Sequence, residues 1–206
     1  MGWFSKKRSP SGDQGRKAAS EPFVADDQVV AHVARLMVMW NDAVGNDAKM
    51  RATASGISSA AGVDDRFYMS GAWIDNPAVL RERPWQMLAA VALRASVQGD
   101  YVLAARIFSF TSFWGRQIAP HLRPADWFDM RLADVPPAIE VEIAAIGFRS
   151  LQQLPSDQVI FSNTTGSVDT GALSVAAASA LTEASEKGFA VDAADLTVAR
   201  GILGQS

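Results

Sequence analysis

The residues best suited to proton transfer in this chain are His121, Asp126 and Asp129. An imidazole held beside a carboxylate can act as a general acid or base near neutral pH. The two aspartates, however, also stand in the first turn of a short expected helix. An aspartate at that position is explained by the helix dipole alone. We therefore predict no catalytic centre from these three residues.

The spacing of the carboxylates and histidines argues against a paired-carboxylate site and against a metal site. Glu140 and Glu142 are two positions apart, so on a helix they point in different directions and cannot act as a pair. The histidines, His32 and His121, have no second ligand at a metal-binding spacing, and the chain contains no cysteine. We predict neither a metal nor a cofactor.

Motifs that bind nucleotides or activate nucleophiles are missing from the sequence. It has no GxSxG, GxxxxGK[ST] or GxGxxG pattern. The polar loop Ser162–Ser167 precedes an expected helix and could hold an anion there, although a capped turn is the commoner use of such a loop. The arginines are scattered rather than interleaved with aromatic residues, so nucleic acid is not an expected partner. These absences favour a protein without enzymatic activity and leave an enzyme as an alternative.

Residues 1–22 differ in composition from the rest of the chain. They mix Gly, Ser, Pro and charge with almost no apolar periodicity, which predicts a flexible arm. Residues 1–20 hold five basic residues and one acidic residue, a net charge of +4, and the remaining 14 basic and 21 acidic residues give −7. Aromatic rings beside cations suit an anionic membrane surface or an acidic partner. The residues expected to make this contact are Trp3, Phe4, Lys6, Lys7 and Arg8.

The sequence predicts no membrane-spanning segment and no secretion signal. No stretch approaches the roughly 18–20 apolar residues needed to cross a bilayer, and no apolar region follows the N-terminal basic run. Beyond the arm the lysines are Lys49 and Lys187, whereas arginine and alanine are frequent, a composition typical of GC-rich bacterial genomes. We expect a bacterial, cytoplasmic protein, with peripheral attachment to the membrane through the arm left open.

Residues 23–206 are predicted to form one all-α domain, because apolar residues recur every three to four positions along most of it. We expect a compact multi-helix bundle of seven to nine helices, with one long central helical hairpin and little or no sheet. Asp, Asn or Pro marks the predicted helix starts, which are Asp26 or Asp27, Asn76-Pro77, Pro136-Pro137, Asp169 or Thr170, and Asp192.

Three segments are predicted to interrupt the helices. Pro84 should break or kink its helix, because the proline ring clashes with the carbonyl of Leu80. Residues 63–76 are expected to form an irregular, aromatic-rich connection. Residues 154–171 are expected to form a loop with a short extended piece at Val159–Phe161.

The central hairpin is predicted from Pro84 to Trp114, with its turn at Gly99-Asp100. Its second helix is apolar on two sides, and such a helix is either central to a domain or covered by a partner. Several positions fall at offsets similar to one tetratricopeptide-type helix pair. That repeat needs several stacked copies, so an ordinary hairpin within a bundle is favoured. The positions are Leu88, Ala92, Ala95, Gly99, Tyr101, Ala104 and Phe108.

Aromatic residues in and after the hairpin carry the functional prediction. Exposed aromatic clusters are enriched at protein interfaces. We therefore expect a helical binding or scaffolding protein that contacts another protein or a second copy of itself. The residues expected to make this contact are Phe110, Phe113, Trp114, Trp127 and Phe128.

Two alternative functions stay open. An enzyme or small-ligand-binding protein would hold its ligand in an inter-helix pocket near residues 63–76, lined by Tyr68, Trp73 and Asp75. A peripheral membrane component would be tethered by the basic arm of residues 1–22.

Overall fold

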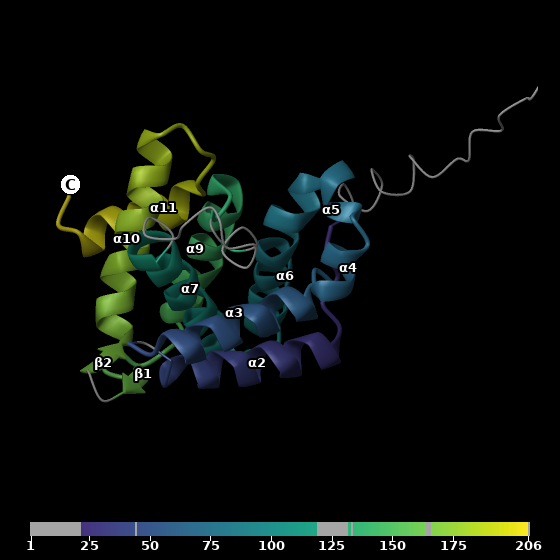
Figure 1. Cartoon of the computed structure of the whole chain (residues 1–206). Helices are drawn as coiled ribbons and strands as arrows, with labels where there is room; N and C mark the ends of the chain where they lie inside the picture. Colours follow the sequence, from purple (N-terminus) through teal and green to yellow (C-terminus); the bar gives the residue numbers. More distant parts are fainter. Residues whose placement is uncertain (1–21, 44, 119–131, 133, 164–165, 206) are drawn as a thin grey trace, which may run out of the picture.

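The computed structural model describes residues 22–43, 45–118, 132, 134–163 and 166–205, and their architecture is all-α, as predicted (Figure 1). A two-stranded antiparallel hairpin of β1 (Val159–Asn163) and β2 (Gly166–Asp169) is the sheet of this part of the chain. The predicted basic arm and the predicted short helix around Trp127 lie outside the described residues.

From α2 to η1 the helices follow one another with short connections, and β1 and β2 lie between α9 and α10. One of the helices, η1, is a π-helical turn that directly continues α7. Their bounds are α2 (Asp27–Asn41), α3 (Asp47–Ala60), α4 (Asp65–Met69), α5 (Ala72–Asp75), α6 (Pro77–Val97), α7 (Tyr101–Phe113), η1 (Trp114–Ile118), α9 (Pro137–Leu151), α10 (Thr170–Glu186) and α11 (Ala193–Ile202).

Acidic and amide side chains begin most of these helices. Each accepts a hydrogen bond from a backbone N–H of the first turn, which has no partner within the helix. Asp26 accepts from the N–H of Val29 at 2.8 Å, and Asp169 accepts from the N–H of Ala172 at 2.8 Å. The other residues in this role are Asn46, Asp64, Asp100 and Asp192.

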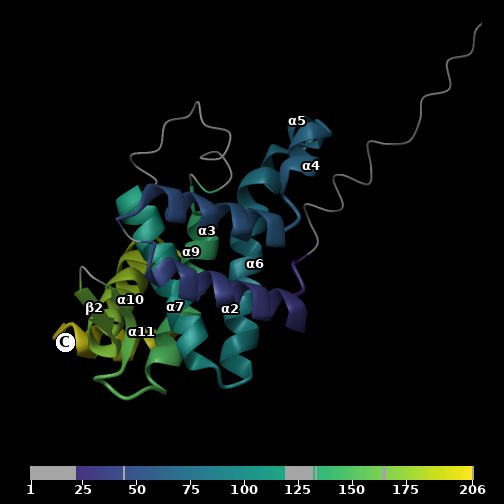
Figure 2. The ribbon, with the colours of Figure 1, turned by 60° about the horizontal axis from the view of Figure 1, so that its bottom comes forward.

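The helices form two groups that cross each other. α2 and α3 pack side by side and lie across α6 and α7 (Figure 2). α9 packs against both α6 and α7, α10 packs on α9, and α11 packs on α10. α7 is therefore enclosed by α2, α6 and α9.

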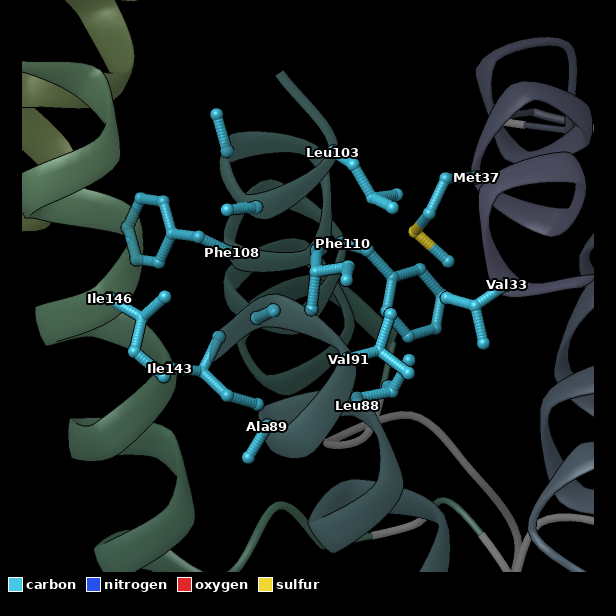
Figure 3. Packing of buried hydrophobic residues seen from close by; sticks show 14 of the residues in the cluster. Val33, Met37, Leu88, Ala89, Val91, Leu103, Phe108, Phe110, Ile143 and Ile146 are labelled. Atoms are coloured by element: carbon cyan, nitrogen blue, oxygen red, sulfur yellow. The ribbon is translucent and has the colours of Figure 1, made fainter. Parts of the chain in front are cut away.

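α7 carries apolar side chains to its neighbours on both sides (Figure 3). Phe108 points toward α9 and Ile146, whereas Phe110 points toward α2 and Val33. Phe110 is fully buried, and its ring lies 4.8 Å from the ring of Trp40 at an interplanar angle of 84°, which is an edge-to-face contact. The predicted central position of this helix in the bundle is confirmed.

α9 approaches α7 closely at Gly147. A Cβ atom at this position would lie 2.5 Å from Cβ of Phe108, far inside van der Waals contact. One turn further on, the buried Ser150 hydroxyl donates to the carbonyl of Ile146 at 2.8 Å and lies 3.1 Å from Oγ of Ser96 on α6. Gly147 is therefore required for the close approach of α9 to Phe108 of α7.

Two of the predicted interruptions differ from the structure. α6 runs as one helix through the buried Pro84, so the predicted break is wrong. Leu80, Met87 and Leu88 of the same helix are buried, and each such side chain contributes about 1.5–3 kcal/mol, which offsets the cost of about 3 kcal/mol for proline inside a helix. Residues 63–76 are also not irregular, because α4 and α5 occupy most of the connection and Asp64 caps α4.

The extended piece predicted at Val159–Phe161 is confirmed, whereas its partner strand was not predicted. Val159 pairs with Asp169, and Ser162 pairs with Ser167. All four residues of β2 are exposed, and their sequence, GSVD, shows no alternation of apolar and polar residues. The sequence pattern that normally predicts a strand is therefore absent.

Gly147→Ala should lower the free energy of unfolding by about 1–3 kcal/mol, because the added methyl group overlaps Phe108 and forces α9 away from α7. Gly201→Ala on α11 is the matched control, since its methyl group would enter open space. The control should be stabilised by up to about 1 kcal/mol through helix propensity. Denaturant unfolding followed by circular dichroism measures both changes, and stabilisation of both variants would contradict the close approach.

Candidate functional site

Two of the five aromatic residues predicted to bind a partner, Phe110 and Trp114, belong to the core. Phe110 and Trp114 are buried, and the indole N–H of Trp114 donates to the carbonyl of Leu132. Phe113 is half-buried, and its ring lies 5.7 Å from that of Trp40. A partner contact needs an exposed ring, so Phe110 and Trp114 are corrected from partner-binding residues to core residues.

Several other predicted site residues lie outside the part of the chain that the structure describes. They comprise the basic arm, the acid/base candidates and two of the aromatic candidates. These residues are Trp3, Phe4, Lys6, Lys7, Arg8, His121, Asp126, Asp129, Trp127 and Phe128.

Two of the residues predicted to line a pocket near residues 63–76, Tyr68 and Asp75, lie on the short helices α4 and α5. Tyr68 is half-buried on α4, and Asp75 is exposed on α5. Two hollows lined by described residues are found elsewhere, along two adjacent faces of α9.

The first hollow, which we call the Glu140 cavity, has a volume of about 350 Å³ and lies between η1, α9 and α10. A separate small hollow of about 10 Å³, which we call the inner end, shares Arg116, Glu140, Ala144 and Ala180 with this cavity and is also lined by Thr111 and Ser112 of α7. The main cavity is lined by four charged residues, Arg116, Glu140, Glu183 and Lys187, and by Pro137, Val141, Ala144, Ala180, Ala184 and Phe189.

The local sequence explains why a hollow forms here. Pro137 begins α9, and Glu140 and Ala144 follow it on one face of the helix, one turn apart. α10 presents Ala180 and Ala184 from the other side of the cavity at the same spacing. Because the alanine side chains are short, they leave space between the two helices.

The Glu140 carboxylate lies against the π-helical turn η1. A Cβ atom added at Gly115 would lie 3.8 Å from Oε1 of Glu140. Within the described residues, no group donates a hydrogen bond to this carboxylate or forms an ion pair with it. Turns of this kind are rare and occur often at functional sites. Glu140 is thus a half-buried acid whose carboxylate has unused acceptor positions beside a cavity.

Burial raises the pKa of Glu140, because water is partly excluded from its carboxylate. The positive charge of Arg116 lowers this pKa, the negative charge of Glu183 raises it, and Lys187 lowers it. On α10, Nζ of Lys187 donates to Oε1 of Glu183 at 2.6 Å, which lowers the pKa of Glu183 and raises that of Lys187. Glu183 and Lys187 therefore neutralise each other, whereas Glu140 has no such partner among the described residues.

The second hollow, which we call the Leu93 groove, has a volume of about 360 Å³ and lies between α6, α9 and the connection that precedes α11. Leu93 lines the groove and is 50% exposed, and Val97, one turn further along α6, is 80% exposed. Glu142 lines this groove and Glu140 lines the other cavity. The different directions predicted for the two glutamates are confirmed.

Sequence reasoning treated Glu140 only as half of a carboxylate pair and did not select Arg116, Glu183 or Lys187. One readable signal existed, because Glu183 and Lys187 stand at the i, i+4 spacing of a helical ion pair. The position of Arg116 beside Glu140 had no local signal, since the two residues belong to different helices.

Across the described residues, no group of three or more potential His, Cys, Asp or Glu ligands gathers around one point. No helix in this part of the chain combines the length and apolar character needed to cross a bilayer. Comparison with protein families, curated proteins and solved structures finds no match for this chain. The Glu140 cavity and the Leu93 groove are therefore the features from which a function can be inferred.

Glu140→Gln should raise the free energy of unfolding at neutral pH by a fraction of a kcal/mol, because it removes the cost of keeping a half-buried carboxylate ionised. The native chain holds the Glu140 proton more tightly than the unfolded chain. The cost is therefore absent below the ordinary pKa of 4.5 and grows as the pH rises through the raised pKa.

The stability difference between Glu140→Gln and the wild type should accordingly widen from about pH 4 to about pH 7 in denaturant unfolding. Glu142→Gln, an exposed position on the same helix, is the matched control for loss of one negative charge. If the difference in free energy of unfolding between Glu140→Gln and the wild type stays constant or narrows over this pH range, the raised pKa of Glu140 is contradicted.

Proposed function

We propose that this chain is a helical binding protein that holds a small molecule in the Glu140 cavity. The observation that carries this proposal is the half-buried Glu140 carboxylate, which lines a mainly apolar cavity and has no partner among the described residues. Sites for small molecules have volumes of about 300–1,000 Å³ and place a few polar groups in an apolar lining. The volume of about 350 Å³ lies within this range.

The groups around the cavity favour binding over catalysis. Among the described lining residues, the hydroxyl groups belong to Thr111 and Ser112 at the narrow inner end, and no imidazole lies beside them to activate a nucleophile. The Thr111 hydroxyl donates to the carbonyl of Ile107 at 2.9 Å. Binding therefore needs only the groups that line the cavity, whereas hydrolysis or group transfer would need Ser112 to be hydrogen-bonded to a base such as Glu140, and no such bond is present among the described residues.

Ala180→Leu should abolish ligand binding, because the larger side chain fills the cavity between α9 and α10. Ala172→Leu, at an exposed position in the first turn of α10, is the matched control and should bind as the wild type does. Ligand-observed NMR with a library of small fragments measures binding, and thermal unfolding checks that both variants fold. The proposal fails if no fragment binds the wild type, or if Ala180→Leu retains the same fragments.

A second function, contact with a partner protein, is favoured by the Leu93 groove. Leu93 and Val97 are one turn apart on α6, and both expose at least half of their surface. Exposed neighbouring apolar side chains are typical of protein interfaces. For the predicted binding or scaffolding role, the accessible Leu93 groove is therefore a better contact surface than the buried Phe110 and Trp114.

Because the chain contains no cysteine, a photo-crosslinker can be attached at one introduced cysteine. Val97→Cys should cross-link a specific partner, and Val198→Cys on α11, which is 47% exposed, should not. The purified partner should then bind the Leu93→Ser/Val97→Ser double variant at least about tenfold more weakly than the wild type. Equal cross-linking from both positions, or unchanged affinity of the double variant, would exclude the groove as the interface.

A further inference from the structure

We propose that the Glu140 cavity binds an organic cation, namely a primary ammonium group carried on a short apolar chain. This inference rests on the proposed function of the cavity and adds the chemical class of its ligand. Two properties of the cavity lining support it. The Glu140 carboxylate has no partner among the described residues, and the side chains around it are mainly aliphatic and aromatic.

The group in the cavity that has no donor among the described residues is an acceptor, the Glu140 carboxylate. Partial burial of a carboxylate costs free energy, and a cation that donates to it supplies a charge-assisted hydrogen bond. Glu140 is held in place by its position in the first turn of α9 and by the backbone of Gly115, which lies beside Oε1. Because Glu140 lines the cavity, an ammonium group there would meet its carboxylate without a rearrangement of the helices.

The cations of the cavity do not form an equivalent anion site. Lys187 is already bound to Glu183 at 2.6 Å, so an anion would have to displace a carboxylate. Arg116 is exposed, and ion pairs formed in water contribute little binding energy. Arg116 also makes no hydrogen bond to Glu140 in the described structure, so it competes with a ligand cation through its charge alone.

The shape of the cavity limits the rest of the ligand. The inner end of about 10 Å³ has room for no more than about one water molecule. The apolar part must therefore extend through the main cavity of about 350 Å³, along Val141, Ala184 and Phe189. A short alkyl chain or a small ring on the amine satisfies this limit.

The affinity should depend on pH with a defined sign. The ammonium group binds the ionised form of the Glu140 carboxylate. Burial raises the pKa of Glu140, and the negative charge of Glu183 raises it further, whereas the positive charges of Arg116 and Lys187 lower it. The affinity therefore increases as the pH rises through the pKa of Glu140. It falls again only when the amine itself loses its proton, near pH 10 for an alkylamine.

The experiment compares three probes of equal chain length, n-hexylammonium, hexanoate and 1-hexanol, on the full chain by calorimetry and amide NMR shifts. We expect n-hexylammonium to bind most tightly and to shift the amides of Ala144, Ala180 and Ala184. Glu140→Gln should weaken its binding at least about tenfold, while Glu142→Gln should leave it unchanged. Arg116→Gln should tighten it, because a competing positive charge is removed.

The outcomes separate this inference from the proposed function. Tighter binding of hexanoate or hexanol, or full affinity of Glu140→Gln for n-hexylammonium, would overturn the ammonium assignment and leave the cavity as a site for another ligand class. No binding of any probe, together with no hit in the fragment library, would overturn both. If Glu140→Gln does not fold, the wild-type affinity must still rise from about pH 4 to about pH 7, and a flat profile overturns the inference.

Discussion

The enclosure of α7 by α2, α6 and α9 is the constraint on which the rest of the structure depends. Its apolar side chains point to both sides, with Phe110 facing α2 and Phe108 facing α9. Gly147 lets the backbone of α9 come close to Phe108, which fixes the rotation of α9 about its own axis. With one face of α9 fixed in this way, Glu140 and Glu142 are directed to separate hollows, so the position of the candidate site follows from packing in the core.

The Glu140 cavity combines two features that normally oppose stability, an unfilled space and a desolvated charge. Alanines on facing helices create the space, and burial beside η1 partly excludes water from the carboxylate. The extensive core around α7 can offset both costs, since it buries several large side chains, including Trp85, Phe110 and Phe148. Residues that lower stability without a packing role are often retained for binding, which is why Glu140 is informative.

Local rules predicted the parts of the fold that depend on neighbouring residues. The caps at Asp26 and Asp192, the start of α9 at Pro137 and the turn at Gly99, whose φ is +83°, follow from short-range chemistry. Pro84 shows the limit of such rules, because burial of α6 on its neighbours outweighs one lost hydrogen bond. The site was less predictable, since the side chains that meet at the cavity come from η1, α9 and α10 and are brought together only by tertiary packing.

The π-helical turn at the end of α7 has a consequence for how this chain can vary in length. Such a turn holds about one residue more than an α-helical turn, and each residue of an α-helix advances by about 100° around the axis. Deleting Gly115 would restore α-helical winding and swing the Arg116 side chain by about 100° relative to α7. A chain shortened in this way would keep the buried core of α7 and present a different side chain to Glu140.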